Sequence, residues 1–126
     1  YEQIEHALEH NSNNGFMHFI AGKIRFLQEK YEDAKMFLIK SYELEKTHDC
    51  ENMLGLCYYE LGNYDQANNI FKHMLEQNPM NVNLLLSSAR CYEKLNDKDS
   101  ALATLDKIVD AFPECEEAQE MIREIS

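Results

Sequence analysis

The sequence predicts an all-α fold built of antiparallel helix pairs. Apolar residues recur about every 3.6 positions along each patterned stretch, and no stretch shows the period of two that a half-buried strand requires. A repeat with helical periodicity indicates helical hairpins that stack on one another. Four pairs of similar residues support such a repeat, each separated by 34 positions: Gly55 and Ala89, Tyr58 and Tyr92, Ala67 and Ala101, and Pro79 and Pro113.

The clearest hairpin is predicted between residues 54 and 79. Gly55 and Ala67 are expected to face each other where two helices cross, because a small side chain lets the backbones approach. Gly62 is expected to form the turn and Pro79 to end the second helix. Larger side chains should fill the space around the crossing, namely Tyr58, Leu61, Tyr64 and Phe71.

This order of residues resembles the tetratricopeptide repeat. The family's signature combines a Leu-Gly pair, here Leu54 and Gly55, with a Tyr, an Ala, an aromatic residue and a terminal Pro at these separations. The resemblance covers essentially the whole chain, although Glu51 stands where the family has a leading Trp. It implies a right-handed α-solenoid, a single array over residues 1–126.

Residues 1–14 are expected to form the second helix of a truncated repeat, followed by a polar loop. One helical face carries the apolar residues Ile4, Ala7 and Leu8. His6 and His10 are four residues apart and could face one metal ion, but no third ligand has a suitable spacing. We therefore expect an exposed helix surface and no metal site.

The first complete repeat is predicted at residues 15–47. Gly22 and Ala34 are expected at its helix crossing, and Tyr31 at the start of its second helix. The two crossing residues lie 33 positions before Gly55 and Ala67. The loop near residues 46 and 47 should therefore be one residue shorter than the loop of the next repeat.

Further repeats are predicted at 48–81 and 82–115, followed at 116–126 by a capping helix or a truncated next repeat. Two positions depart from the pattern. Arg25 stands where later repeats have Tyr58 and Tyr92, which changes the packing expected there. Asn96 replaces the glycine of the turn; asparagine is the best alternative for a left-handed backbone, so we expect a slightly weaker hairpin. The last segment should cover the third repeat with one apolar face, made by Ala118, Met121, Ile122 and Ile125.

Composition excludes several kinds of partner. The formal net charge of -11 opposes binding to nucleic acid and to anionic membranes, which gain affinity from clustered Lys and Arg. No apolar run approaches the roughly 20 residues that span a bilayer. The four cysteines, Cys50, Cys57, Cys91 and Cys115, lack the spacing of a metal site. Cys57 and Cys91 stand at equivalent positions of successive repeats, and we expect these two to be small buried side chains. Reduced thiols favour a cytoplasmic location.

The resemblance also implies a concave groove lined by the first helix of each repeat. Outward residues at helical spacing predict the groove-lining set Phe16, Phe19, Lys23, Phe26, Asn52, Leu56, Tyr59, Leu86, Arg90 and Glu93, with Asp49, Glu60, Asn83 and Lys94 on the same stripes. The alternative is that Phe16 and Phe19 pack on the preceding helix. No nucleophile, acid-base pair or metal constellation has a defensible spacing, so we expect neither catalysis nor a cofactor.

The predicted function is binding of a protein or peptide segment. A groove that combines Phe26, Leu56, Tyr59 and Leu86 with Lys23 and Arg90 suits an amphipathic helix or extended segment that is partly acidic. A receptor for a C-terminal carboxylate is disfavoured, because Asn52 fits that pattern but the accompanying basic residues do not follow in order. The alternatives are a self-assembly module that stacks end to end, or a regulatory arm of a longer protein.

Overall fold

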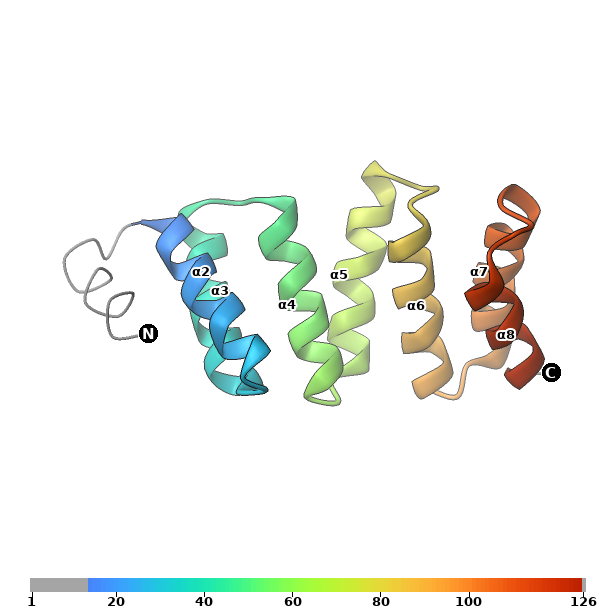
Figure 1. Cartoon of the computed structure of the whole chain (residues 1–126), viewed down its shortest axis with the longest axis horizontal. Helices are drawn as coiled ribbons and strands as arrows, with labels where there is room; N and C mark the ends of the chain where they lie inside the picture. The colour runs from blue at the N-terminus through green and yellow to red at the C-terminus, as the bar shows by residue number, and fades with distance from the viewer. Residues whose placement is uncertain (1–13, 126) are drawn as a thin grey trace. The chain divides into compact units, whose positions relative to one another are not determined.

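The computed structural model describes residues 14–125, which are entirely helical apart from short connections (Figure 1). The all-α prediction is confirmed for this part of the chain, where no strand occurs. The chain divides into two compact units: unit 1 is Tyr1–Asn63 and unit 2 is Tyr64–Ser126. The helices of unit 1 are α2 (Gly15–Leu27), α3 (Tyr31–Leu44) and α4 (His48–Glu60). Those of unit 2 are α5 (Tyr64–Gln77), α6 (Val82–Lys94), α7 (Lys98–Ala111) and α8 (Glu116–Ile125).

Side-chain caps fix where α2, α4 and α6 begin. The side chains of Asn14, Thr47 and Asn81 accept hydrogen bonds of 3.1 to 3.2 Å from the backbone N–H three residues later. These bonds satisfy donors that the first turn of a helix leaves without a partner. The three caps stand at the same place in successive repeats, so each repeat starts its first helix in the same way.

The turns that follow these helices also share one geometry. Glu29, Gly62 and Asn96 have positive φ values of 62°, 84° and 63°, which confirms the left-handed turn expected at Gly62 and Asn96. One residue further on, the backbone N–H donates to the carbonyl of Arg25, Tyr58 or Tyr92 at 2.8 to 2.9 Å. The backbone carbonyl of Arg25 therefore accepts the same turn hydrogen bond as the carbonyls of the two tyrosines, although its side chain is different.

The connection between α3 and α4 contains the expected deletion. Helix α3 ends at Leu44 and α4 begins at His48, which leaves three residues, 45 to 47. Helix α5 ends at Gln77 and α6 begins at Val82, which leaves four residues, 78 to 81. The 33-residue spacing of the first repeat is thus explained by one residue fewer in this loop.

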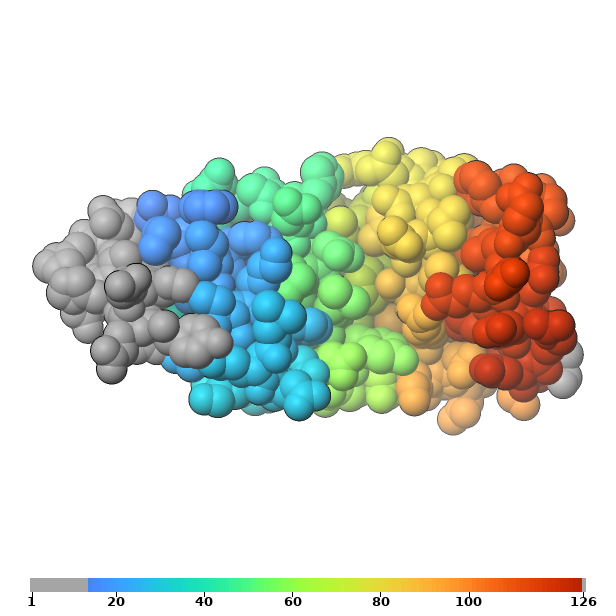
Figure 2. All heavy atoms as spheres, viewed as in Figure 1, coloured from blue at the N-terminus to red at the C-terminus, as the bar shows by residue number. Residues whose placement is uncertain are grey.

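Unit 1 is held together by a close approach of α2 and α3. A Cβ atom built on Gly22 would lie 2.7 Å from Leu38 Cγ and 3.3 Å from the carbonyl oxygen of Ala34, so only glycine fits without movement. Ala34 and Leu38 are fully buried. At the other end of the pair, the Ser41 hydroxyl donates to the carbonyl of Gly15 at 2.7 Å. The crossing predicted at Gly22 and Ala34 is confirmed. In Figure 2 the atoms of this pair, drawn in blue to cyan, form one continuous surface.

Unit 2 has an apolar core between α6, α7 and α8. It is formed by the buried residues Leu85, Leu86, Ala89, Leu105, Ile108, Ala118 and Met121, with Ile122 and Ile125 packed against it. Helix α8 covers the third repeat as expected, because its apolar face meets this core and its acidic residues are exposed. Between α5 and α6, the Ser88 hydroxyl donates to the side-chain oxygen of Asn68 at 2.6 Å, and both residues are buried.

Two predictions are not tested by this structure. Gly55 belongs to unit 1 and Ala67 to unit 2, so their facing remains a prediction, although both are buried. The truncated helix and the pair His6 and His10 lie outside the described residues.

Candidate functional site

The first helices of unit 1, α2 and α4, carry most of the residues predicted to bind a partner. Phe16 is 60% exposed and Lys23 is also exposed. Five further residues are half-buried: Phe19, Phe26, Asn52, Leu56 and Tyr59. All seven therefore retain surface on two neighbouring helices, and α2 contacts α4 directly. This set is called the first-helix surface of unit 1 below.

A cavity of about 110 Å³ opens at one end of the first-helix surface. Phe16 and Phe19 of α2 line it together with Thr47 and Asp49, which lie where α4 begins. Glu45 is brought to the cavity by the absence of a side chain at Gly15, since a Cβ atom there would lie 2.7 Å from Glu45 Cβ. The cavity therefore joins an aromatic wall to two carboxylates.

Phe26 has a structural contact as well as an exposed edge. Its ring meets that of Tyr31 at the start of α3, with the ring centres 5.2 Å apart and the planes at 73°. An edge-to-face pair of this kind stabilises the turn between α2 and α3. Phe26 is therefore a fixed part of the surface, because its ring is held by the neighbouring helix.

The predicted residues of unit 2 behave differently. Leu86 is only 5% exposed and lies in the core, so its predicted place on an outward surface is wrong. The reason is α8, whose Ala118 and Met121 belong to the same core cluster as Leu86. The Arg90 guanidinium forms an ion pair with Glu117 of α8, and both side chains are about half exposed. Glu93 has one enclosed carboxylate oxygen for which no hydrogen-bond partner is present in the described part of the chain.

Three of the four cysteines are enclosed in the helix packing. Cys50, Cys57 and Cys91 are fully buried, which confirms the expectation for Cys57 and Cys91, and burial raises the pKa of these two to about 12. Neutral thiols of this kind are poor nucleophiles and poor metal ligands. Among residues 14–125, no three His, Cys, Asp or Glu side chains are grouped so that they could hold a metal ion. Nor does any described helix have the length and apolar character needed to cross a membrane.

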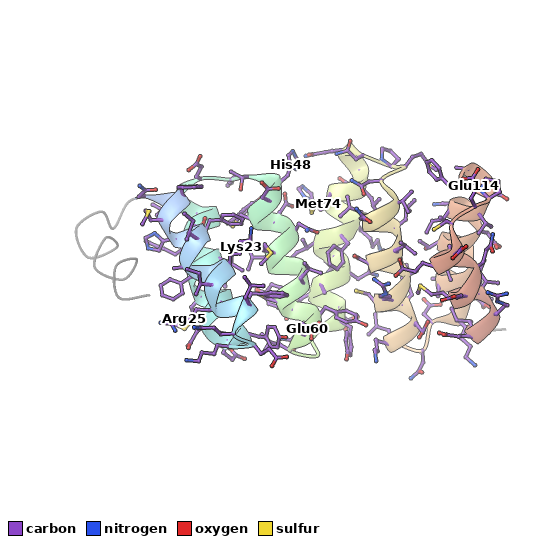
Figure 3. All side chains as sticks on the ribbon, viewed as in Figure 1. Lys23, Arg25, His48, Glu60, Met74 and Glu114 are labelled. Atoms are coloured by element: carbon purple, nitrogen blue, oxygen red, sulfur yellow. The ribbon has the colours of Figure 1, made fainter. Side chains whose placement is uncertain are left out.

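A second cavity of unit 1 was missed by the sequence reasoning. It measures about 450 Å³ and is lined by His18 and Arg25 of α2 and by Asp33, Met36, Phe37 and Lys40 of α3. Figure 3 labels Arg25 and Lys23 on opposite sides of α2, as expected for residues two positions apart on a helix. The repeat register could have revealed this face, because Arg25 stands at the position that Tyr58 and Tyr92 occupy in the later repeats.

Comparison with known proteins agrees with this architecture. A family model described as tetratricopeptide repeat matches residues 58–125, which is 68 of 126 residues and more than half of the chain. The TPR repeat-containing protein MJ1428 of Methanocaldococcus jannaschii is 33% identical over 79 residues, or 63% of this chain and 14% of that protein. The uncharacterized protein ycf37 of Pyropia yezoensis is 36% identical over 58 residues, or 46% of this chain and 33% of that protein. The chain thus spans a third or less of the curated relatives that it matches.

Two solved structures show the same fold at low sequence identity. YrrB, described as a TPR protein with an unusual peptide-binding site, has a TM-score of 0.87 at 24% identity, covering 97% of this chain and 63% of that one. The first TPR of Spaghetti (RPAP3), bound to the HSP90 peptide SRMEEVD, has a TM-score of 0.78 at 16% identity, covering 89% and 90%. With the family match, the helix bounds and the repeated caps and turns, these likenesses lead to one conclusion: the chain belongs to the tetratricopeptide repeat family.

Proposed function

We propose that this protein is a non-catalytic interaction module that binds a peptide or helical segment of a partner on the first-helix surface of unit 1. One observation carries the proposal. Aromatic and aliphatic side chains on α2 and α4 keep surface beside the cavity at Phe16 and Phe19, although a folded helix pair normally buries such residues. A concave site with an apolar wall and a few charged groups is what a bound segment requires.

The charges on this surface indicate how the segment would be oriented. Asp49 and Glu45 line the cavity and would repel an acidic side chain there. Lys23 lies one helical turn beyond Phe19 on α2 and is exposed. An amphipathic segment would therefore place an apolar residue at the Phe16 and Phe19 wall and an acidic residue near Lys23.

The peptide-binding neighbours support this mode of action without identifying the partner. The printed descriptions of YrrB and of the first TPR of Spaghetti both refer to peptides. A segment bound along exposed helix faces is held by apolar burial, as in a protein core, and by a small number of charged contacts. We extend this mode to the present chain as the function that its unit 1 supports best.

The test starts from selected peptides and substitutes single residues. Random ten-residue peptides displayed on phage are selected on the full chain, and the strongest binder is synthesised and titrated by calorimetry. Tyr59→Ala should weaken binding about thirtyfold, or about 2 kcal/mol, because central aromatic residues dominate such interfaces. Lys23→Glu should weaken an acidic peptide more than its neutral analogue at low salt.

The matched control lies on the other helix of the same unit. Met36 of α3 is 68% exposed and outside the proposed surface, so Met36→Ala should leave the affinity unchanged. Thermal unfolding of each variant separates lost binding from lost folding. Equal affinities for Tyr59→Ala and the unsubstituted chain, with both folded, would move the binding surface elsewhere.

Self-assembly is the second candidate function, and one observation favours it. Leu27, the last residue of α2, is 73% exposed. Contact between copies would cover such a residue. Sedimentation over a concentration series distinguishes the two functions, since growing oligomers indicate assembly and a constant monomer mass indicates a surface kept for a partner.

A further inference from the structure

The cavity beside the first-helix surface of unit 1 is lined by two carboxylates that no cation of the described chain neutralises. Glu45 directly follows α3, and Asp49 lies in the first turn of α4. Among residues 14–125, neither of these carboxylates forms an ion pair. Lys46, which stands between them in the sequence, instead places its Nζ 5.9 Å from the ring centre of Tyr42. The negative charge of the cavity is therefore left for a ligand.

The polar side chains around the cavity mainly offer hydrogen-bond acceptors. A Cβ atom built on Gly15 would lie 3.3 Å from Glu45 Oε2, so the Glu45 carboxylate is folded back beside the start of α2. The Ser41 hydroxyl, which also lines the cavity, donates its proton to the carbonyl of Gly15 at 2.7 Å. Its oxygen can then only accept from a ligand. A ligand that carries several donors fits this lining.

The two helix starts at the cavity do not reverse its charge. Phe16 lies in the first turn of α2 and Asp49 in the first turn of α4, and both residues line the cavity. The start of a helix carries a partial positive charge of roughly +0.5. Two such starts offset only one of the two carboxylates, which leaves a net charge of about -1. The cavity should therefore attract a cation and repel an anion.

The aromatic wall and the size of the cavity narrow the kind of cation. Phe16 and Phe19 form the wall, and the face of an aromatic ring attracts a cation. The volume of about 110 Å³ is several times the roughly 10 to 15 Å³ that one water molecule needs, so the end of a side chain can enter. Lysine and arginine combine a methylene stem, which packs on apolar surface, with a cation that carries several donors.

We propose, on the basis of the function proposed above, that this cavity receives a lysine or arginine side chain of the bound segment. The stem makes the apolar contact with Phe16 and Phe19, and the cation is attracted to Glu45 and Asp49. Lys23, one helical turn beyond Phe19, attracts an acidic residue of the same segment. The segment is therefore basic at the cavity and acidic beside Lys23, which fixes the direction in which it lies on α2.

A small probe tests the cavity without any bound segment. N-acetyl-arginine amide is titrated into the isotope-labelled full chain, and NMR follows the backbone amides of Phe16 and Asp49. We expect saturable shifts at millimolar concentration, with the affinity reduced about two- to fivefold by Glu45→Gln or by Asp49→Asn. Glu43→Gln removes an exposed carboxylate of α3 that does not line the cavity and should leave the affinity unchanged.

Uncharged and acidic probes provide the opposite outcome. N-acetyl-norleucine amide has a similar stem but no charge, and N-acetyl-glutamate amide has a negative charge. Equal shifts with either of these probes, or no shift of Phe16 and Asp49 with the arginine probe, would overturn the cation site. Thermal unfolding of each variant shows that the fold is kept.

The selected decapeptides then test the basic residue within a segment. Replacing it by norleucine should weaken binding to the unsubstituted chain about fivefold, but less than twofold when Glu45→Gln and Asp49→Asn are combined. Peptides that bind through Tyr59 and tolerate norleucine would overturn the basic residue while keeping the proposed function. A chain that binds the arginine probe but selects no peptide would overturn the proposed function and support the cation site.

Discussion

The two units have different residues at equivalent positions of the helix packing. At one register position α2 carries Gly22 and α6 carries Ala89, and at another α3 carries Leu38 and α7 carries Leu105. In unit 1 a methyl group at position 22 would collide with Leu38. In unit 2 the methyl of Ala89 lies inside the core beside Leu105 and is fully buried. The same repeat position therefore requires glycine in unit 1 and accommodates the methyl group of alanine in unit 2.

The units also differ in where they expose large apolar side chains. In unit 1 these are Phe16, Leu27, Met36 and Ile39, all within helices. In the described part of unit 2 they are Met80, Leu95 and Phe112, all in loops or just after a helix end. Helix α8 closes the core of unit 2, whereas unit 1 presents helix faces that another segment could cover. This contrast is the physical reason for placing the proposed function on unit 1.

The largest expected effect comes from enlarging the side chain at position 22, compared with removing the methyl group at position 89. Gly22→Leu should lower the free energy of unfolding by about 3 kcal/mol, because the added side chain must displace Leu38. Ala89→Gly should cost only about 1 kcal/mol, mainly through backbone freedom in the unfolded chain. Urea unfolding followed by circular dichroism measures both.

Lys23→Leu is the control for Gly22→Leu. It adds an apolar side chain at the next position of α2, where the native residue is exposed, and should change stability little. Similar losses at positions 22 and 23 would contradict the close approach of α2 and α3.

The next effect concerns buried thiols that report on each unit separately. Cys57 of unit 1 and Cys91 of unit 2 are both fully buried with pKa values raised to about 12 by burial. Either thiol should react with a labelling reagent only when its unit opens. We expect Cys57 to label about tenfold faster than Cys91, because α8 closes the core of unit 2. Mass spectrometry after timed labelling measures both rates, and equal rates would argue against the difference between the units.

The raised pKa values of these two thiols also predict how the stability of the fold depends on pH. An unfolded thiol loses its proton near the ordinary value of 9.0, but folded Cys57 and Cys91 hold theirs to about 12. Between these values the folded state binds more protons than the unfolded state, so stability falls as pH rises. The contribution should be complete below pH 9 and decline above it, which denaturant unfolding at pH 8, 9 and 10 would show. Cys57→Ala and Cys91→Ala should each reduce the decline.

Most of the fold could be predicted because it depends on local and periodic signals. The turn at Gly62, the burial of Ala34 and the shortened loop before His48 follow from residue type and spacing alone. The positive φ of Glu29 could not be predicted, since glutamate has no preference for that backbone region. The geometry of the repeated turn imposes the positive φ at this position, although glutamate does not favour it.

The candidate site could be predicted only in part. Helical spacing placed Phe16 and Lys23 on the outside of their helix, where both are exposed, but that they line a groove stays a prediction. It failed at Leu86, because spacing along α6 does not reveal that α8 packs over that residue. It also missed the cavity at His18 and Met36, whose walls come from two different helices. Burial by a third helix is a long-range property that a local pattern does not contain.

The smallest expected effect compares the three turns. A non-glycine residue at positive φ costs roughly 1 to 2 kcal/mol, and glycine avoids this at an entropic cost of roughly 0.5 to 1 kcal/mol. Glu29→Gly should therefore stabilise unit 1 by about 0.5 kcal/mol or slightly more, since Glu29 has a φ of 62°. Asn96→Gly in unit 2 should have almost no effect, because asparagine already tolerates this region. Thermal unfolding of the two variants would show whether Glu29→Gly raises the midpoint more than Asn96→Gly does. A lower midpoint for Glu29→Gly would mean that the glutamate side chain contributes more to unit 1 than its backbone costs.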